Sequence, residues 1–300
     1  MTKIKYWIQA FRLRTLPLAI SSIIVGGFLA FFDGRFSFLV TFLAIITTTL
    51  LQILSNLAND YGDYKSGADN NNRIGPERTL QGGKISPSAM ITGIIITSIL
   101  SLFFGVWLIY VGTKSLSFSF GIIFFIIGLC AMAAAIKYTV GKKAYGYFGL
   151  GDFFVFIFFG LAGILGTYFL NTHFLRIEIL LPAISIGFLS TGVLNLNNMR
   201  DWENDKITGK KTIVVKFGIK AAKYYHTLLI LGAILSAVIF ILLNYISPFQ
   251  FLFLITFPIL FYDLNKVLKN TEPEKLDPFL KRLALTTLLF SITFGIGLVI

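Results

Sequence analysis

The sequence FSFLVTFLAIITTTLLQILSNLANDYGDYKSGAD, residues 36–69, joins a long apolar segment to a cluster of carboxylates and amides. Residues 36–57 carry no charge, and a helix needs roughly 20 apolar residues to cross a bilayer. The carboxylates follow directly where this apolar segment ends. The pattern predicts a transmembrane helix whose end carries polar groups at one surface of the membrane.

The composition of the whole chain favours a membrane protein. Of its 300 residues, 56% are hydrophobic and only 13% are charged, and the mean hydropathy is +0.80. A soluble domain has to cover its surface with charged and polar groups, so this composition excludes one. The scarcity of charge and the 32 phenylalanines exclude a disordered chain, and the single cysteine, Cys130, excludes a disulfide scaffold.

Apolar segments of similar length recur along the chain. The charge-free segment 224–262 contains a turn-like stretch at 244–248, which divides it into two spans. We therefore expect an all-α integral membrane protein with nine transmembrane helices, in which residues 1–300 form a single transmembrane domain. The expected spans are 16–32, 36–57, 89–111, 116–136, 153–170, 179–199, the two halves of 224–262, and 283–300.

The basic residues indicate how these spans are oriented. All of the 26 Lys and Arg residues except Arg35, Lys114 and Arg176 lie in the N-terminal segment or in the loops on its side. By the positive-inside rule, this side and the N-terminus face the cytoplasm. We therefore attribute the net charge of +12 to membrane topology, and bases spread over short loops do not predict a nucleic-acid surface.

Polar side chains at the end of the second expected span fall on one face of a helix. If the helix continues past residue 57, Asn56, Asp60 and Asp63 are spaced i, i+4 and i+7. Asn59 then lies one turn before Asp63. The spacing predicts an oxygen-rich strip along the last turns of this helix.

The sixth expected span ends in NLNNMRDWENDKITGKKT, residues 195–212, and repeats the arrangement. On a continuing helix, Asn197, Asp201 and Asp205 are spaced i, i+4 and i+8 and share one face. A single cluster of this kind is most simply a solvated helix end. Two clusters on the same side of the membrane, each followed by a basic loop, favour a functional site.

The residue types in both clusters point to a hard metal ion and phosphate. Crowded carboxylates repel one another unless a cation lies between them, and oxygen ligands without His or Cys select an ion such as Mg²⁺. Mg²⁺ commonly bridges a few carboxylates to substrate phosphates, and phosphates need bases nearby. The bases that follow the two clusters are Lys65, Arg73, Arg78 and Lys84, and then Lys206, Lys210 and Lys211.

At these residues the sequence resembles the UbiA superfamily of intramembrane prenyltransferases, whose two aspartate-rich motifs end the second and sixth of nine helices. Within that superfamily it is most similar to the branch that prenylates 1,4-dihydroxy-2-naphthoate. The stretches that carry the resemblance are FRLRTLPLA (11–19), NLANDYGDYKSGAD (56–69), RIGPERTLQGG (73–83), YGYFGLGDFFVFIFFG (145–160) and the second motif extended to residue 218.

The resemblance implies a Mg²⁺-dependent transfer of a polyprenyl group from polyprenyl diphosphate to the naphthoate ring. Pyrophosphate and carbon dioxide leave, and the product is demethylmenaquinone, a menaquinone precursor. It also implies a multi-pass protein of the bacterial cytoplasmic membrane with its site facing the cytoplasm. The implied metal ligands are Asp60, Asp63, Asp201 and Asp205, and the implied diphosphate-binding residues are Asn56, Asn59, Lys65, Arg73, Arg78, Lys137, Asn197, Lys210 and Lys211.

Four further residues have open roles at this stage. Tyr138 is a candidate for stabilising the allylic cation through its ring, and Arg14 is a candidate for contacting the acceptor. The general superfamily pattern has a third Asp where this chain has Gly67, so the metal role of the next acid, Asp69, is left open. Asp152 fits a helix N-cap as well as a site residue.

Two alternative functions fit parts of the sequence. A related enzyme of the same superfamily would use another acceptor, such as 4-hydroxybenzoate, haem or a glycerol phosphate. A cation transporter would place acids near the middle of the membrane, whereas here the long spans are free of charge. The length of the prenyl chain, the residues of the acceptor pocket and the oligomeric state have no signal in the sequence.

Overall fold

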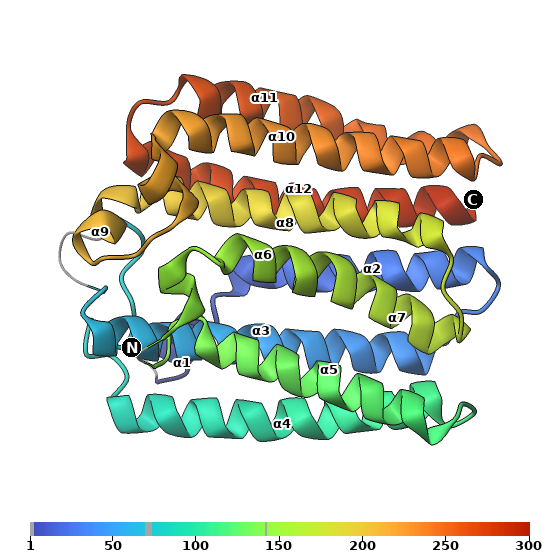
Figure 1. The fold of residues 1–300 in the computed structure, drawn as a ribbon, viewed down its shortest axis with the longest axis horizontal. Coiled ribbons are helices and arrows are strands. Elements are labelled where there is room, and N and C mark those ends of the chain that lie inside the picture. Colours follow the sequence, from blue (N-terminus) through green and yellow to red (C-terminus); the bar gives the residue numbers. More distant parts are fainter. Residues whose placement is uncertain (1–2, 70–73, 142) are drawn as a thin grey trace.

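The structure is a computed structural model that describes residues 3–69, 74–141 and 143–300. Within these ranges, nine helices are long and apolar enough to cross a membrane. Figure 1 shows them running side by side along one direction as a bundle. The predicted all-α, nine-span membrane architecture is therefore confirmed for the described residues.

Most of the spans are single helices, and two are composite. The fifth span joins two α-helices through a π-helical segment, and the eighth joins a 3₁₀ segment to an α-helix. The spans are α2 (Leu16–Phe32), α3 (Phe38–Ser66), α4 (Pro87–Thr113), α5 (Phe118–Lys137), α6 with η3 and α7 (Gly151–Val155, Phe156–Ala162, Gly163–Thr172), α8 (Leu180–Arg200), α10 (Ile213–Leu243), η5 with α11 (Pro248–Thr256, Phe257–Lys269), and α12 (Asp277–Val299).

Short helices complete the chain between the spans. They precede the first span, cap the loops at the end of the bundle that carries the acidic motifs, and precede α8 and α12. They are α1 (Lys3–Phe11), η1 (Leu13–Thr15), η2 (Tyr145–Phe148), η4 (Ile177–Ile179), α9 (Trp202–Ile207) and η6 (Pro273–Leu276).

The helix ends follow from local capping, and some differ from the sequence prediction. Helix α3 continues past its apolar run to Ser66, as the motif requires, and ends where Gly67 adopts a left-handed φ of 74°. The predicted break at 244–248 is present, because Ser247 and Gln250 form a capping box that starts η5. The last helix begins at Asp277, well before the expected start at 283.

The two halves of the bundle are packed to different extents. The main core is formed by buried side chains of α2, α7, α8, α10, α11 and α12, together with Phe253 of η5. Helices α4 and α5 lie at the opposite edge in Figure 1, and none of the most apolar stretch of α5 is buried. The inner face of α5 therefore borders open space instead of packed side chains.

A close approach of two glycines holds the fifth span against α8. The π-helical segment Phe156–Ala162 contains Gly160, and a Cβ added there would lie 2.7 Å from the carbonyl oxygen of Ala183 and 2.8 Å from the Cα of Gly187. Backbones can approach this closely only where small residues meet, which is the usual device between membrane helices.

We predict that Gly160→Leu destabilises the protein by about 1–3 kcal/mol, because the added side chain forces η3 away from α8. Thermal unfolding of the purified protein in detergent measures the effect. Gly121→Ala is the control, because a Cβ there would meet only Thr113 Oγ1 at 3.6 Å, which is an ordinary contact. Equal stability of the Gly160→Leu variant and the control would contradict the packing argument.

Candidate active site

A cavity of about 980 Å³ runs through the bundle. Its walls come from α2, α3, α4, α5, η3, α7 and α8, with α12 contributing at the polar end. One end is polar and lies at the motif end of the bundle, while the rest is lined mainly by Phe, Leu, Ile, Ala and Gly. The charged and amide residues at the polar end are Arg12, Arg14, Asn56, Asn59, Asp63, Asp69, Arg78, Asn197, Asn198, Asp201, Asn204, Asp205, Lys210 and Lys281.

The first motif reaches the cavity through Asn56, Asn59 and Asp63, on the last turns of α3. This part of α3 packs tightly against the end of α5, because a Cβ at Gly62 would lie 2.6 Å from the carbonyl oxygen of Thr139. The Thr139 hydroxyl also donates to Asn59 Oδ1 at 3.1 Å. Only glycine at position 62 allows this contact, which fixes the orientation of the Asn59 amide at the cavity wall.

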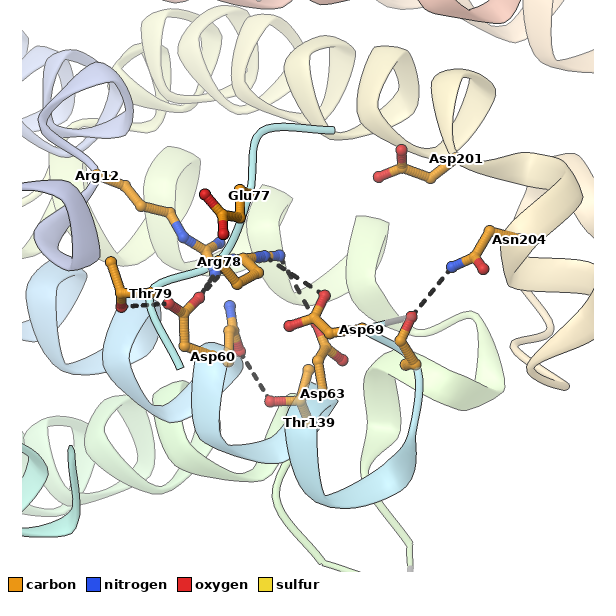
Figure 2. A network of polar contacts seen from close by, with 12 residues as sticks. Arg12, Asp60, Asp63, Asp69, Glu77, Arg78, Thr79, Thr139, Asp201 and Asn204 are labelled. Carbon is orange, nitrogen blue, oxygen red and sulfur yellow. Dashed lines mark hydrogen bonds and ion pairs between the residues drawn. The ribbon is translucent and has the colours of Figure 1, made fainter. Parts of the chain in front are cut away.

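Asp60 belongs to the same motif but does not line the cavity. Its side chain is buried and points toward the N-terminal segment and the loop after α3, as Figure 2 shows. There it forms an ion pair with Arg12, accepts from Arg78 at 2.6 Å and accepts from the Thr79 hydroxyl at 3.4 Å. Asp60 thus ties three separate segments together, and the metal role implied for it stays a prediction.

Arg78 connects Asp60 to the acids that do line the cavity. In Figure 2 its guanidinium lies between Asp60 on one side and Asp63 and Asp69 on the other, at 3.7 Å and 3.6 Å from their carboxylate oxygens. The backbone N–H of Asp69 donates to the carbonyl of Asp63 at 3.2 Å just beyond α3. Asp69, whose role the sequence left open, is thereby held at the cavity beside Asp63.

The second motif lies on two helices instead of one. Helix α8 ends at Arg200, α9 begins at Trp202, and Asp201 between them has a φ of −94° and a ψ of 7°. The motif therefore does not lie on one continuous helix as expected, because the backbone at Asp201 is not helical. Backbone hydrogen bonds from Asp201 to Asn197 and from Asp205 to Asp201 bridge the bend, so all three side chains still line the cavity.

Arg200 orients the side chain of Asp201. It is a residue that the sequence analysis did not single out. Arg200 is fully buried and donates to both carboxylate oxygens of Asp201, at 2.8 Å and 2.7 Å. It also forms an ion pair with Asp277, the first residue of α12, and Arg14 lies 3.5 Å from the same carboxylate. A bidentate contact of this kind fixes the orientation of a carboxylate as well as its charge.

Lys210 bridges the two motifs across the cavity. Its ammonium lies 3.3 Å from Asp63 and 3.7 Å from Asp205, and 5.0 Å from the centre of the Tyr147 ring. Burial lowers the pKa of Lys210, but the carboxylates of Asp63 and Asp205 outweigh it, so the net shift of the pKa is upward. Lys210 therefore stays charged between the two acids.

Two tyrosines complete the polar end of the cavity. Tyr147 donates to Asp63 at 2.8 Å, and burial followed by the charge of Asp63 raises its pKa. Tyr138 also lines the cavity, and burial followed by the charge of Asp152 raises its pKa. Tyr138 is thus a neutral phenol with its ring beside Tyr145, at 5.4 Å between centroids.

Asp152 lies in the first turn of α6, buried and outside the cavity lining, while the N-cap of that helix is Leu150.

The donor chemistry at this end fits Mg²⁺. Carboxylate and amide oxygens line it, neither His173 nor His226 lines the cavity, and Cys130, which does, lies eight residues before Tyr138 on α5. Asn204 is buried at the same place, and its Oδ1 has no hydrogen-bond partner among the described residues. In those residues no three acids lie close enough to form a metal cluster, because Arg78 and Lys210 stand between the carboxylates.

Some residues implied for diphosphate binding lie away from the cavity. Lys65, Lys137 and Lys211 are exposed and do not line it. Arg73 lies outside the described residues. Conversely, Asn204 and Tyr147 line the cavity and lie inside stretches that carried the family resemblance, whereas no motif marks Asp277 or Lys281.

Comparison with known proteins agrees with this architecture. The chain matches the UbiA prenyltransferase family over residues 19–291. It is 42% identical over 300 residues to a Haemophilus influenzae protein named 1,4-dihydroxy-2-naphthoate octaprenyltransferase, covering 99% of this chain and 97% of that one. An Escherichia coli protein of the same name is 41% identical over 298 residues, covering 99% and 96%.

A solved structure has the same fold. It is a UbiA homolog from Archaeoglobus fulgidus bound to DMAPP and Mg²⁺, with a TM-score of 0.62 and 17% sequence identity, covering 96% of this chain and 98% of that chain. The family match covers most of the sequence, and the two relatives cover it almost end to end. The chain is a multi-pass membrane protein and belongs to the UbiA prenyltransferase family.

Proposed function

We propose that this chain transfers a polyprenyl group from polyprenyl diphosphate to 1,4-dihydroxy-2-naphthoate. The C–O bond between the allylic carbon and the diphosphate breaks, and a C–C bond forms between that carbon and the naphthoate ring. The carboxyl group leaves as carbon dioxide, and its bonding electrons return to the ring. The product is demethylmenaquinone at its hydroquinone level, together with pyrophosphate. The names of the two bacterial relatives support this choice of acceptor.

The observation that carries the proposal is one cavity with two chemically different ends. Two acidic motifs and four Arg or Lys residues from the N-terminal half and the loops meet at the polar end. The apolar part extends along α5 from Tyr138 to Phe120, a distance of about 27 Å at the rise of an α-helix. A diphosphate joined to a long hydrocarbon chain has the same division into polar and apolar parts.

The residues at the polar end have distinct proposed roles. Asp63, Asp69, Asp201 and Asp205, with Asn59, Asn197 and Asn204, would hold Mg²⁺, which when bound neutralises the charge that develops on the leaving diphosphate. Arg78 and Lys210 bind the diphosphate oxygens in place of their present carboxylate partners. The phenol of Tyr138 stays protonated and presents its ring to the allylic carbon.

The direct test uses the purified full chain in liposomes with a polyprenyl diphosphate and 1,4-dihydroxy-2-naphthoate. We expect prenylated product and pyrophosphate in equal amounts, no turnover after chelation of divalent metal, and recovery on addition of Mg²⁺. Turnover of 4-hydroxybenzoate instead of the naphthoate would move the chain to another branch of the family. Product formation that survives chelation would contradict the metal assignment.

We predict that Asp201→Asn lowers kcat by about 10²-fold, because one of the charges that stabilise the leaving group is lost. Single-turnover kinetics at saturating Mg²⁺ measure the effect. Glu203→Gln is the matched control, because Glu203 follows Asp201 by two residues and does not line the cavity. The same loss of activity in both variants would indicate general damage to the bend after α8.

Substitutions of Asp60 and Asp63 should change the kinetics in different ways, although both residues belong to one motif. Asp60 forms ion pairs with Arg12 and Arg78 outside the cavity. In Asp60→Asn, Arg78 should be displaced, and the KM for the donor should rise by about tenfold. The Mg²⁺ concentration for half-maximal activity should stay unchanged. In Asp63→Asn, the Mg²⁺ concentration for half-maximal activity should rise. An equal rise in Asp60→Asn would indicate that Asp60 is a metal ligand as well.

The apolar part of the cavity should accept the prenyl tail. Gly166 lines it, and a Cβ there would meet only the Phe124 ring, at 3.8 Å. We predict that Gly166→Trp lowers activity with a long polyprenyl donor by about tenfold or more and leaves a C10 donor nearly unaffected, because the indole fills the cavity below the first isoprene units. Ile122→Trp on the outer face of α5 is the control.

We also propose that the polar end of the cavity faces the cytoplasm of a bacterial cell. Both motifs and nearly all of the basic residues lie at that end of the bundle, which supports the orientation by the positive-inside rule. A single-cysteine variant with Cys130 replaced and a new cysteine at Lys269 tests it. Labelling by a membrane-impermeant thiol reagent should occur in inverted vesicles and fail in intact cells.

A further inference from the structure

Lys281 is a base with an exposed side chain at the polar end of the cavity. It lies on α12, one helical turn beyond Asp277, and lines the polar end of the cavity. The other bases there are paired: Arg78 and Lys210 each contact carboxylates of the motifs. Within the described residues Lys281 forms no ion pair. A positive charge at the wall of a mainly apolar cavity favours an anionic ligand.

A second polar group in the same corner of the cavity is unsatisfied. Ser190 of α8 is 1% exposed and lines the cavity, and its Oγ has no hydrogen-bond partner among the described residues. Buried hydroxyls are almost always hydrogen-bonded to protein or to a bound molecule. Many other buried Ser and Thr hydroxyls of this bundle donate to a carbonyl one turn earlier, as Thr191 does to Gly187. Ser190 Oγ is therefore an unpartnered polar group beside the cavity.

Helix packing determines the depths at which Lys281 and Ser190 lie along the bundle. Helices α8 and α12 run in opposite directions, and the contact between Arg200 and Asp277 aligns their ends. Lys281 lies one turn inward from that contact, and Ser190 lies ten residues inward, at a depth of about 15 Å. Apolar residues of the same two helices also line the cavity, namely Leu280 and Ala284 from α12 and Val193 and Leu194 from α8.

We infer that this corner, between α8 and α12, binds the aromatic carboxylate acceptor. Lys281 pairs with the carboxylate, Ser190 Oγ hydrogen-bonds to a ring hydroxyl, and the apolar side chains between them contact the ring faces. This inference rests on the proposed function and names the acceptor subsite of the same cavity. It places the acceptor on the opposite wall from Arg78, so that the carboxylate of the acceptor does not compete with the diphosphate for the same base.

The test compares Lys281→Met, Lys281→Arg and the control Lys269→Met in the full-length protein. Lys269 is exposed at the end of α11 and does not line the cavity. We expect Lys281→Met to raise the KM for 1,4-dihydroxy-2-naphthoate by about tenfold or more, as for loss of a charged hydrogen bond. The KM for the donor should stay within about twofold, Lys281→Arg should recover most of the affinity, and the control should match the wild type.

An acceptor analogue without the carboxylate separates the two contacts. Inhibition by 1,4-dihydroxynaphthalene should be equal in the wild type and in Lys281→Met, because the analogue has no group for Lys281 to bind. Ser190→Ala should weaken the same inhibition about fivefold, because the hydroxyl contact is lost. Weaker inhibition by the analogue in Lys281→Met would contradict the assigned pairing of Lys281 with the carboxylate.

Two outcomes would overturn the inference while leaving the proposed function intact. If Lys281→Met raises the KM for the donor instead of the acceptor, Lys281 serves the diphosphate. If neither KM changes, the lysine has no part in binding. Equilibrium binding of 2-naphthoate to the wild type and to Lys281→Met tests the subsite without turnover. This measurement tests the subsite even if 1,4-dihydroxy-2-naphthoate proves not to be the acceptor. Loss of affinity in the variant supports the subsite, and equal affinity refutes it.

Discussion

The polar end of the cavity depends on bringing four carboxylates together inside a membrane bundle. Burying such charges without partners costs several kcal/mol each, so each acid at the cavity needs a cation. Arg78 and Lys210 supply this between the motifs, and Arg200 supplies it behind Asp201. These bases come from the loop after α3, the loop after α9 and the end of α8. Charge neutralisation therefore also links the loops to the helix ends at the polar end of the cavity.

The same ion pairs connect elements far apart in the sequence. Asp60 joins the N-terminal segment to the loop after α3 through Arg12 and Arg78. Asp277 joins α12 to α8 through Arg200. A substrate diphosphate that took over one of these bases would leave its former carboxylate unpaired, which favours binding of a divalent cation at the same time. On the proposed function, this arrangement would couple the binding of the metal to the binding of the diphosphate.

The sequence was sufficient for the spans and for locating a candidate site, because hydrophobic length and i, i+4 spacing are local properties. It could not separate Asp60 from Asp63. On an α-helix, Asn59 and Asp60 lie at the two edges of the strip, about 100° apart, and only the neighbouring helices decide which edge meets the cavity. The bend at Asp201 was also hidden, because the residues around it are compatible with a continuous helix.

The residues that sequence reasoning missed are those defined by tertiary contacts. Arg200 is buried because Asp277 approaches it from a helix that begins far along the chain, and no periodicity links the two positions. Lys281 was counted among the bases that orient the membrane protein. Its place at the cavity follows only from the early start of α12 at Asp277 and from the direction in which that helix packs.

The π-helical turn in the fifth span has a consequence for the rest of that span. A π-turn adds one residue to the helix without adding a full step of rotation, so every side chain beyond it is turned by about 100° relative to an uninterrupted α-helix. Gly166 and Phe169 face the cavity in this shifted register. A backbone feature thus sets which side of α7 faces the cavity, and loss of a single residue from 156–162 would turn that side by about 100°.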